Sequence, residues 1–201
     1  MNAMLKKTLT LGIGILGWAG GYTAVAQFQE YNAMQKASSQ LDGLLAVPVE
    51  SREAAATKLL AQDASQANSR AALKRSAAGF LIGWRIRNIE AYSTVCHKHG
   101  VELSAWSAKI AQATSGEYAA ANKVVTAADI AKMRDFLLQR IVVDAEKEIQ
   151  SMATQQGWPM GDACNALNII AGEPEAWKEM WPEVSPYKFG PKQMAALMEA
   201  N

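Results

Sequence analysis

Three glycines near the N-terminus have the spacing of a phosphate-binding loop. Gly12, Gly14 and Gly17 match G-x-G-x-x-G, in which a strand leads into a tight turn and a helix N-terminus receives a dinucleotide pyrophosphate. The eleven residues before Gly12 include two lysines, which leaves little room for a buried first strand. We therefore expect no dinucleotide here, and the sequence predicts no cofactor elsewhere.

The same stretch has the features of an export signal. Two lysines precede an uncharged apolar run over residues 9–21 and an Ala-x-Ala cleavage site at residues 24–26. The alternative is that residues 1–26 remain as an inner-membrane anchor, because no charge follows the lysines until Glu30 and about 20 residues span a bilayer. Either way, we expect residues from Gln27 onward in the periplasm of a Gram-negative bacterium, free or held at the membrane.

The cysteines and histidines offer two kinds of site. An even number of cysteines without a C-x-x-C motif, in an oxidising compartment, predicts one structural disulfide between Cys96 and Cys164. The alternative is a closed zinc site made by Cys96, His99, Asp162 and Cys164, which requires both thiols to be free.

Carboxylates offer acid and base chemistry without histidine. Glu50-Ser51 resembles the Glu-Ser at a helix end in lysozyme-like lytic transglycosylases, where the glutamate is the general acid. The resemblance covers these two residues, and residues 63–75 (DASQANSRAALKR) stand where that family carries a glycine-rich stretch ending in Leu-Met-Gln. It implies a peptidoglycan-acting hydrolase that uses Glu50. We interpret Asp144 and Glu148, four apart on a predicted helix, as solvated surface neighbours.

The elements that carry these residues should nearly all be helices. Alanine is abundant and five of the six prolines lie in the last quarter of the chain. We predict an all-α domain of five to seven helices behind the N-terminal segment, with a bundle core over residues 27–157 and a Pro/Trp-rich tail over residues 158–201 packed on it. Three-and-four spacing of apolar residues, with cap and stop signals, predicts core helices over residues 31–46, from 51, 70–99, from 104 and 127–156.

The predicted helix over residues 70–99 forms the centre of the bundle, because its apolar positions cover about half of its circumference. Its first twenty residues contain basic side chains and no acidic one. They are either solvated or available to anionic lipid headgroups or an acidic partner. These residues are Arg70, Lys74, Arg75, Arg85 and Arg87.

The tail supplies aromatic side chains that suit either a core or an interface. Trp177, Trp181 and Tyr187 stand among prolines, so the segment wraps back over the bundle or is presented to a partner. The near-neutral net charge implies no nucleic-acid partner. The sequence therefore favours a non-catalytic exported or membrane-tethered envelope protein that binds another envelope protein or a membrane complex, as an accessory or assembly component. The alternative is the hydrolase that uses Glu50.

Overall fold

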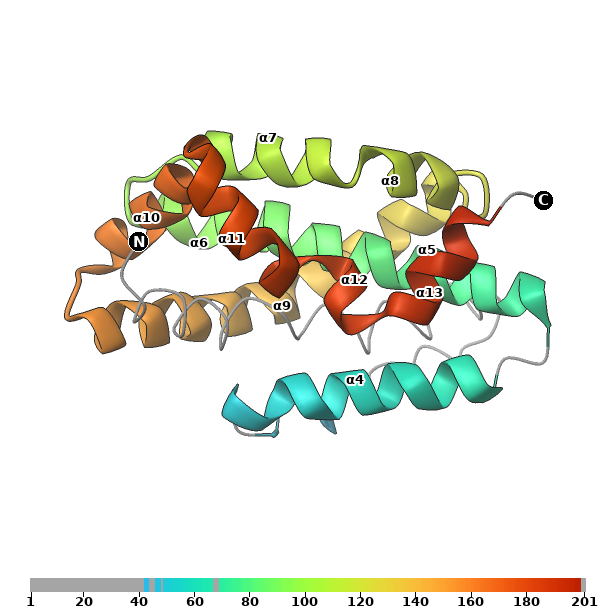
Figure 1. Cartoon of the computed structure of the whole chain (residues 1–201). Helices are drawn as coiled ribbons and strands as arrows, with labels where there is room; N and C mark the ends of the chain where they lie inside the picture. The colour runs from blue at the N-terminus through green and yellow to red at the C-terminus, as the bar shows by residue number, and fades with distance from the viewer. Residues whose placement is uncertain (1–41, 44–45, 48, 67–68, 200–201) are drawn as a thin grey trace.

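The computed structural model describes residues 42–43, 46–47, 49–66 and 69–199. Every regular element in these ranges is a helix, which confirms the expected all-α class for this part of the chain (Figure 1). None of these helices combines the length and hydrophobicity that a membrane crossing requires. The predicted signal or anchor over residues 1–26 and most of the predicted helix over residues 31–46 lie outside the described residues.

The central helix runs in three parts without interruption, as α5 (Arg70–Arg85), the π-helical turn η1 (Ile86–Ala91) and α6 (Tyr92–Lys98). The Ser69 side chain caps its start by accepting a hydrogen bond from the Ala72 N–H at 3.1 Å. Gly100, with φ of 75°, ends it in the left-handed conformation. Nine consecutive residues, 76–84, are buried, so the second half of α5 is surrounded on all sides, while its first turns retain exposed residues.

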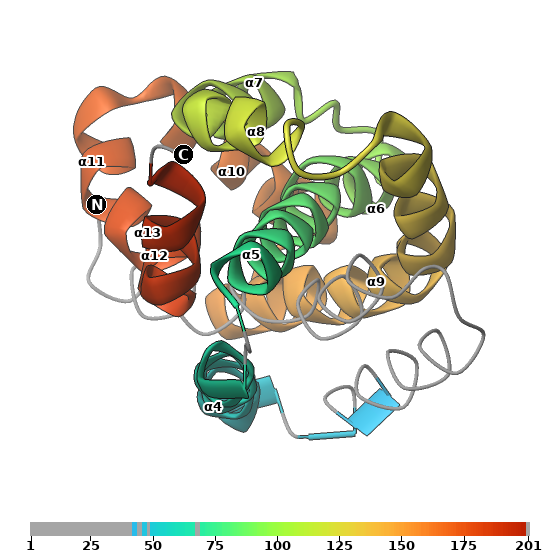
Figure 2. The ribbon, with the colours of Figure 1, turned by 90° about the vertical axis from the view of Figure 1, so that its right-hand side faces the viewer.

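The long helix α9 (Ala127–Gln156) lies along η1 and α6 (Figure 2). Its limits follow the sequence signals, because Thr126 accepts a hydrogen bond from the Asp129 N–H and Gly157 ends it with φ of 67°.

On the other side of the central helix lie α7 (Ser104–Ala113) and α8 (Ser115–Ala121). The sequence predicted one helix here, but Thr114 interrupts it with φ of −119° and ψ of 19°. The Thr114 hydroxyl donates to the Ile110 carbonyl at 2.8 Å and accepts from Arg85. The interruption therefore lies where a side chain of the central helix meets this layer.

The tail crosses the bundle as four helices. It is therefore divided into more helices than the predicted total of five to seven for the domain allowed. Prolines begin three of them, because proline fits the first turn of a helix but cannot continue one. The last helix packs against α5 and α8. The four are α10 (Met160–Gly172), α11 (Pro174–Val184), α12 (Pro186–Phe189) and α13 (Pro191–Met198).

The remaining described helix, α4 (Val49–Gln66), lies beside α12 and α13 (Figure 1). It begins two residues before the predicted start at residue 51.

Four tryptophans hold the tail on the bundle. Trp177 and Trp181 of α11 stack with ring centroids 5.2 Å apart. Trp177 meets the edge of Trp106 at 6.0 Å, and Trp181 meets Trp84 at 6.2 Å. Such pairs add about 0.5–1.5 kcal/mol each beyond the area they bury. These contacts join α11 to both α5 and α7.

Candidate functional site

The two cysteines join the end of the central helix to the tail. Cys96 in α6 and Cys164 in α10 lie at disulfide distance, with sulfur atoms 2.02 Å and Cα atoms 5.6 Å apart. The zinc alternative therefore loses its two sulfur ligands, while His99 and Asp162 are exposed. Among the described residues, no group of three or more His, Cys, Asp or Glu side chains is placed to hold a metal ion.

The basic residues of the central helix do not share one surface. Arg70 and Lys74 both bind Glu199, which follows α13, through its carboxylate and its carbonyl respectively, and Arg75 is exposed. Arg85 is half-buried, with its guanidinium 4.2 Å from the centre of the Tyr118 ring. Arg87 is fully buried. The predicted docking surface is therefore reduced to the residues at the start of α5.

The tail aromatics divide between core and surface. Trp177 is only 9% exposed and Trp181 is partly buried, so the structure places both in the packing of the tail rather than at an open surface. Tyr187 is 41% exposed, and its hydroxyl donates to the Glu117 carboxylate at 2.6 Å. Tyr187 alone of the three remains largely accessible.

A cluster of ionisable side chains lies inside the core where η1 and α6 meet α9. Arg87 forms an ion pair with Glu148, and the Tyr92 hydroxyl donates to the same carboxylate at 2.9 Å. Asp144, one turn before Glu148, is also buried. The interpretation of Asp144 and Glu148 as solvated neighbours is therefore wrong.

The sequence held a signal for this cluster. Asp144 and Glu148 occupy the same three-and-four spaced face of α9 as Ile141, Ala145 and Ile149, which are all buried. Charge alone favours the solvated face, but the spacing places both carboxylates on the apolar face.

The charges of this buried cluster do not balance when all are ionised. Arg87 supplies one positive charge against the two carboxylates of Asp144 and Glu148. Burial raises the pKa of the Glu148 carboxyl to about 7; Arg87 opposes this shift and Asp144 adds to it. The Glu148 carboxyl is therefore close to taking up a proton at neutral pH.

This cluster positions helices rather than reaching a substrate. A general acid or base must come within hydrogen-bond distance of its substrate, and Glu148 is only 3% exposed and Arg87 not exposed at all. Nearby side chains also bind the widened turn: Asn88 donates to the Trp84 carbonyl at 2.8 Å, and the Trp106 indole donates to the Asn88 carbonyl at 2.7 Å. Together these bonds fix η1 against α7 and α9.

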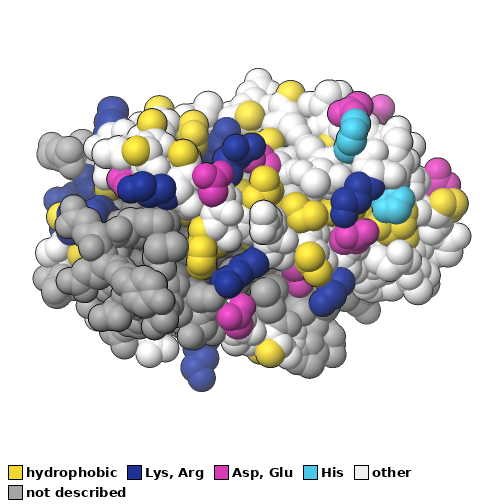
Figure 3. Space-filling model, turned by 180° about the vertical axis from the view of Figure 1, so that it is seen from behind, with side chains coloured by type: hydrophobic (Ala, Val, Ile, Leu, Met, Phe, Trp, Pro, Cys, Tyr) yellow, Lys and Arg dark blue, Asp and Glu magenta, His cyan; other side chains and the backbone are white. Residues whose placement is uncertain are grey.

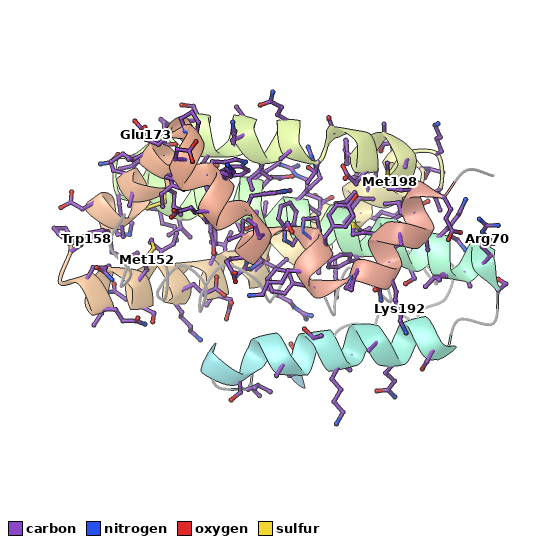
Figure 4. The ribbon with its side chains drawn as sticks, viewed as in Figure 1. Arg70, Met152, Trp158, Glu173, Lys192 and Met198 are labelled. Atoms are coloured by element: carbon purple, nitrogen blue, oxygen red, sulfur yellow. A yellow bond between two sulfur atoms is a disulfide. The ribbon has the colours of Figure 1, made fainter. Side chains whose placement is uncertain are left out.

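A surface hollow of about 420 Å³ lies between α10 and α11, near the turn that follows α9. We call it the α10–α11 hollow. Trp158 and Glu173, which line it, lie at the end of the molecule opposite Arg70 and Met198 (Figure 4). It is lined by five apolar residues, Trp158, Ala166, Ile169, Ile170 and Ala176, and by three glutamates, Glu173, Glu175 and Glu179.

Ile169 is the most unusual residue of the hollow, because 63% of it is exposed. This exposure follows from helix geometry. Cys164, Leu167 and Ile170 share the buried face of α10, and Ile169 is rotated about 100° from Ile170, away from that face. By contrast, the face seen in Figure 3 interleaves hydrophobic side chains with charged ones. This surface was not predicted from the sequence, although two adjacent isoleucines on one helix indicate that one points outward.

Glu50 is the second residue of α4, and its side chain lies outside the described part of the structure. The hydrolase alternative therefore stays a prediction. Comparison with protein-family models finds no matching family, and no curated protein or solved structure matches the chain.

Proposed function

We propose that this protein is a non-catalytic component of the bacterial envelope that acts by binding another protein, as an accessory of a membrane complex. The observation that carries the proposal is the α10–α11 hollow with its exposed Ile169. The exposed Ile169 shares the lining with the partly buried Trp158 and Ala176, and apolar surface that gathers in one place is more typical of interaction sites than side chains exposed singly.

The surroundings of the hollow support a role in docking. Cys164 ties α10 to the central helix, and Trp177 ties α11 to α7, so both walls are held by the bundle. A preformed surface loses little conformational entropy when a partner binds. The disulfide also suits the oxidising periplasm that the features of residues 1–26 predict.

The proposal is tested by crosslinking in living cells. The full chain, tagged at its C-terminus and expressed at its native level, is crosslinked with formaldehyde and purified from solubilised membranes. We expect a discrete crosslinked species that contains a second protein in a fixed ratio. A chain recovered only as itself contradicts the proposal.

A cell-wall zymogram separates this function from the hydrolase alternative. The purified protein should clear no peptidoglycan, and Glu50→Gln should behave like the unmodified chain. Clearing that disappears in the Glu50→Gln variant would replace the docking function with the hydrolytic one.

A further inference from the structure

We propose that the α10–α11 hollow binds an apolar segment of a different protein that carries lysine or arginine beside its apolar side chains. This inference rests on the proposed function and specifies the chemistry of the partner.

The apolar lining requires an occupant with apolar side chains. Ile169 is exposed and Trp158 is partly buried, so both retain surface that a partner can cover. A volume of about 420 Å³ lies within the range of roughly 300–1,000 Å³ found for ligand pockets. Because the hollow leaves Ile169 so exposed, a segment lying across α10 and α11 would cover it better than a small molecule seated below the surface.

The charges around the hollow select for a positive partner. Its charged lining residues are all glutamates, and each is exposed. Within the described residues, neither Glu173 nor Glu175 has an ion-pair partner. A neutral or acidic segment would remove water from these carboxylates without replacing its hydrogen bonds, which is unfavourable. Lysine or arginine would replace them, while an anionic lipid surface would be repelled.

A second copy of this chain fits less well. The exposed Arg70 at the start of α5 lies at the end of the molecule opposite the hollow (Figure 4). Arg70 and Lys74 also already bind Glu199. Pairing the two ends of successive copies would be head-to-tail and would lead toward open chains rather than a closed dimer.

The test places a photo-crosslinking amino acid at position 179 of the full chain in its native host. A second strain carries it at position 143, because Val143 is 56% exposed on α9 and gives a matched control away from the hollow. Crosslinked segments are identified by mass spectrometry. We expect position 179, and not 143, to capture a segment of a different protein with apolar side chains flanked by lysine or arginine.

Variants in the position-179 strain then test the two halves of the argument. Glu173→Gln with Glu175→Gln should reduce the crosslink roughly three- to tenfold. Ile169→Ser should reduce it roughly tenfold. The double variant Asp129→Asn with Asp135→Asn makes the same charge change at a partly buried and an exposed position of α9 and should leave the yield unchanged. Circular dichroism melting shows that each variant is folded.

Each other outcome has a definite meaning. Capture of a lipid, of a second copy, or of a segment without basic residues overturns the inference, as does a yield that Glu173→Gln with Glu175→Gln leaves unchanged. Two further strains carry the photo-crosslinking amino acid at position 75 or 187. If position 179 captures nothing but one of these positions captures a protein, the proposed function stands and the assignment of the hollow fails. If no position captures a protein, both fail.

Discussion

At the scale of single residues, the buried carboxyl of Glu148 should make stability depend on pH. Its pKa is raised to about 7 in the folded protein, whereas an unfolded glutamate has a pKa near 4.5. The folded state therefore holds a proton that the unfolded state has released between these values, so stability falls as pH rises through this window. We expect a free energy of unfolding that is higher at pH 5 than at pH 8, by about 1.4 kcal/mol per pH unit between the two pKa values.

Urea unfolding at several pH values measures this dependence, and Glu148→Gln provides the control. Glutamine keeps the shape of the side chain and still accepts hydrogen bonds from Arg87 and Tyr92, but it does not titrate. The difference in pH dependence between the two proteins isolates Glu148 from the exposed groups. Identical pH profiles would show that Glu148 is not the buried group that binds the proton.

Arg87 should be the most sensitive residue of the same cluster. Arg87→Met leaves the buried Glu148 carboxylate without the guanidinium that it pairs with, which costs about 3–5 kcal/mol for a buried pair broken on one side. Adding Glu148→Gln should restore part of the loss, because it removes the stranded charge. Arg75→Met, at an exposed position of the same helix, should change the free energy of unfolding little. Guanidinium unfolding of the three proteins ranks these effects.

The sequence predicted the buried face of a helix but not the pairing of charges inside the core. Helix periodicity located the buried face of α9 correctly, including Ile141 and Ile149. It did not show that Arg87, 61 residues away in sequence, would meet Glu148 inside the core. A buried charge becomes predictable only when its counter-charge is known, and that pairing depends on the arrangement of helices.

At the scale of elements, the π-helical turn η1 sets the register between α5 and α6. A π-turn contains one residue more than an α-helical turn, so deleting one residue there restores a regular α-helix and keeps the faces of both flanking segments. We therefore expect deletion of Glu90 to preserve the pairing of Cys96 with Cys164. Deletion of Thr94, which lies inside α6, should turn Cys96 by about 100° and prevent the bond.

Thiol titration of the unfolded, unreduced variants measures the outcome. The Glu90 deletion should show no free thiol and the Thr94 deletion two per chain. The Glu90 side chain is partly buried and the Thr94 side chain is exposed. A difference between the two variants therefore does not come from the loss of a core side chain. Free thiols in both variants would mean that η1 does not act as a removable insertion.

The limits of the helices were easier to predict than their interruptions. Gly100, Thr126 and Gly157 act within a few residues of the chain, so their types alone indicate where a helix begins or ends. The interruption at Thr114 involves Arg85 of another helix. The widened turn at η1 likewise coincides with the buried pair of Arg87 and Glu148. Contacts between distant segments are not encoded in local spacing.

At the scale of the whole molecule, the Cys96–Cys164 bond joins the centre of the bundle to the tail over a separation of 68 residues. Replacing both cysteines by serine should lower the free energy of unfolding by about 4 kcal/mol, because the unfolded chain is then no longer restricted by a closed loop. Chemical unfolding of the variant and of the oxidised protein measures the difference. A loss close to zero would mean that the tryptophan contacts alone hold the tail.

The same bond depends on the order in which its two cysteines are synthesised. A chain made from its N-terminus completes the central helix and Cys96 well before Cys164 exists, and α7, α8 and α9 are synthesised in between. During that interval the growing chain carries an unpaired thiol beside an apolar helix face that the tail will later cover. The tail must therefore be synthesised before the end of the central helix can be closed by the disulfide. A nascent chain stopped short of Cys164 keeps a thiol that can exchange with the disulfides of other proteins.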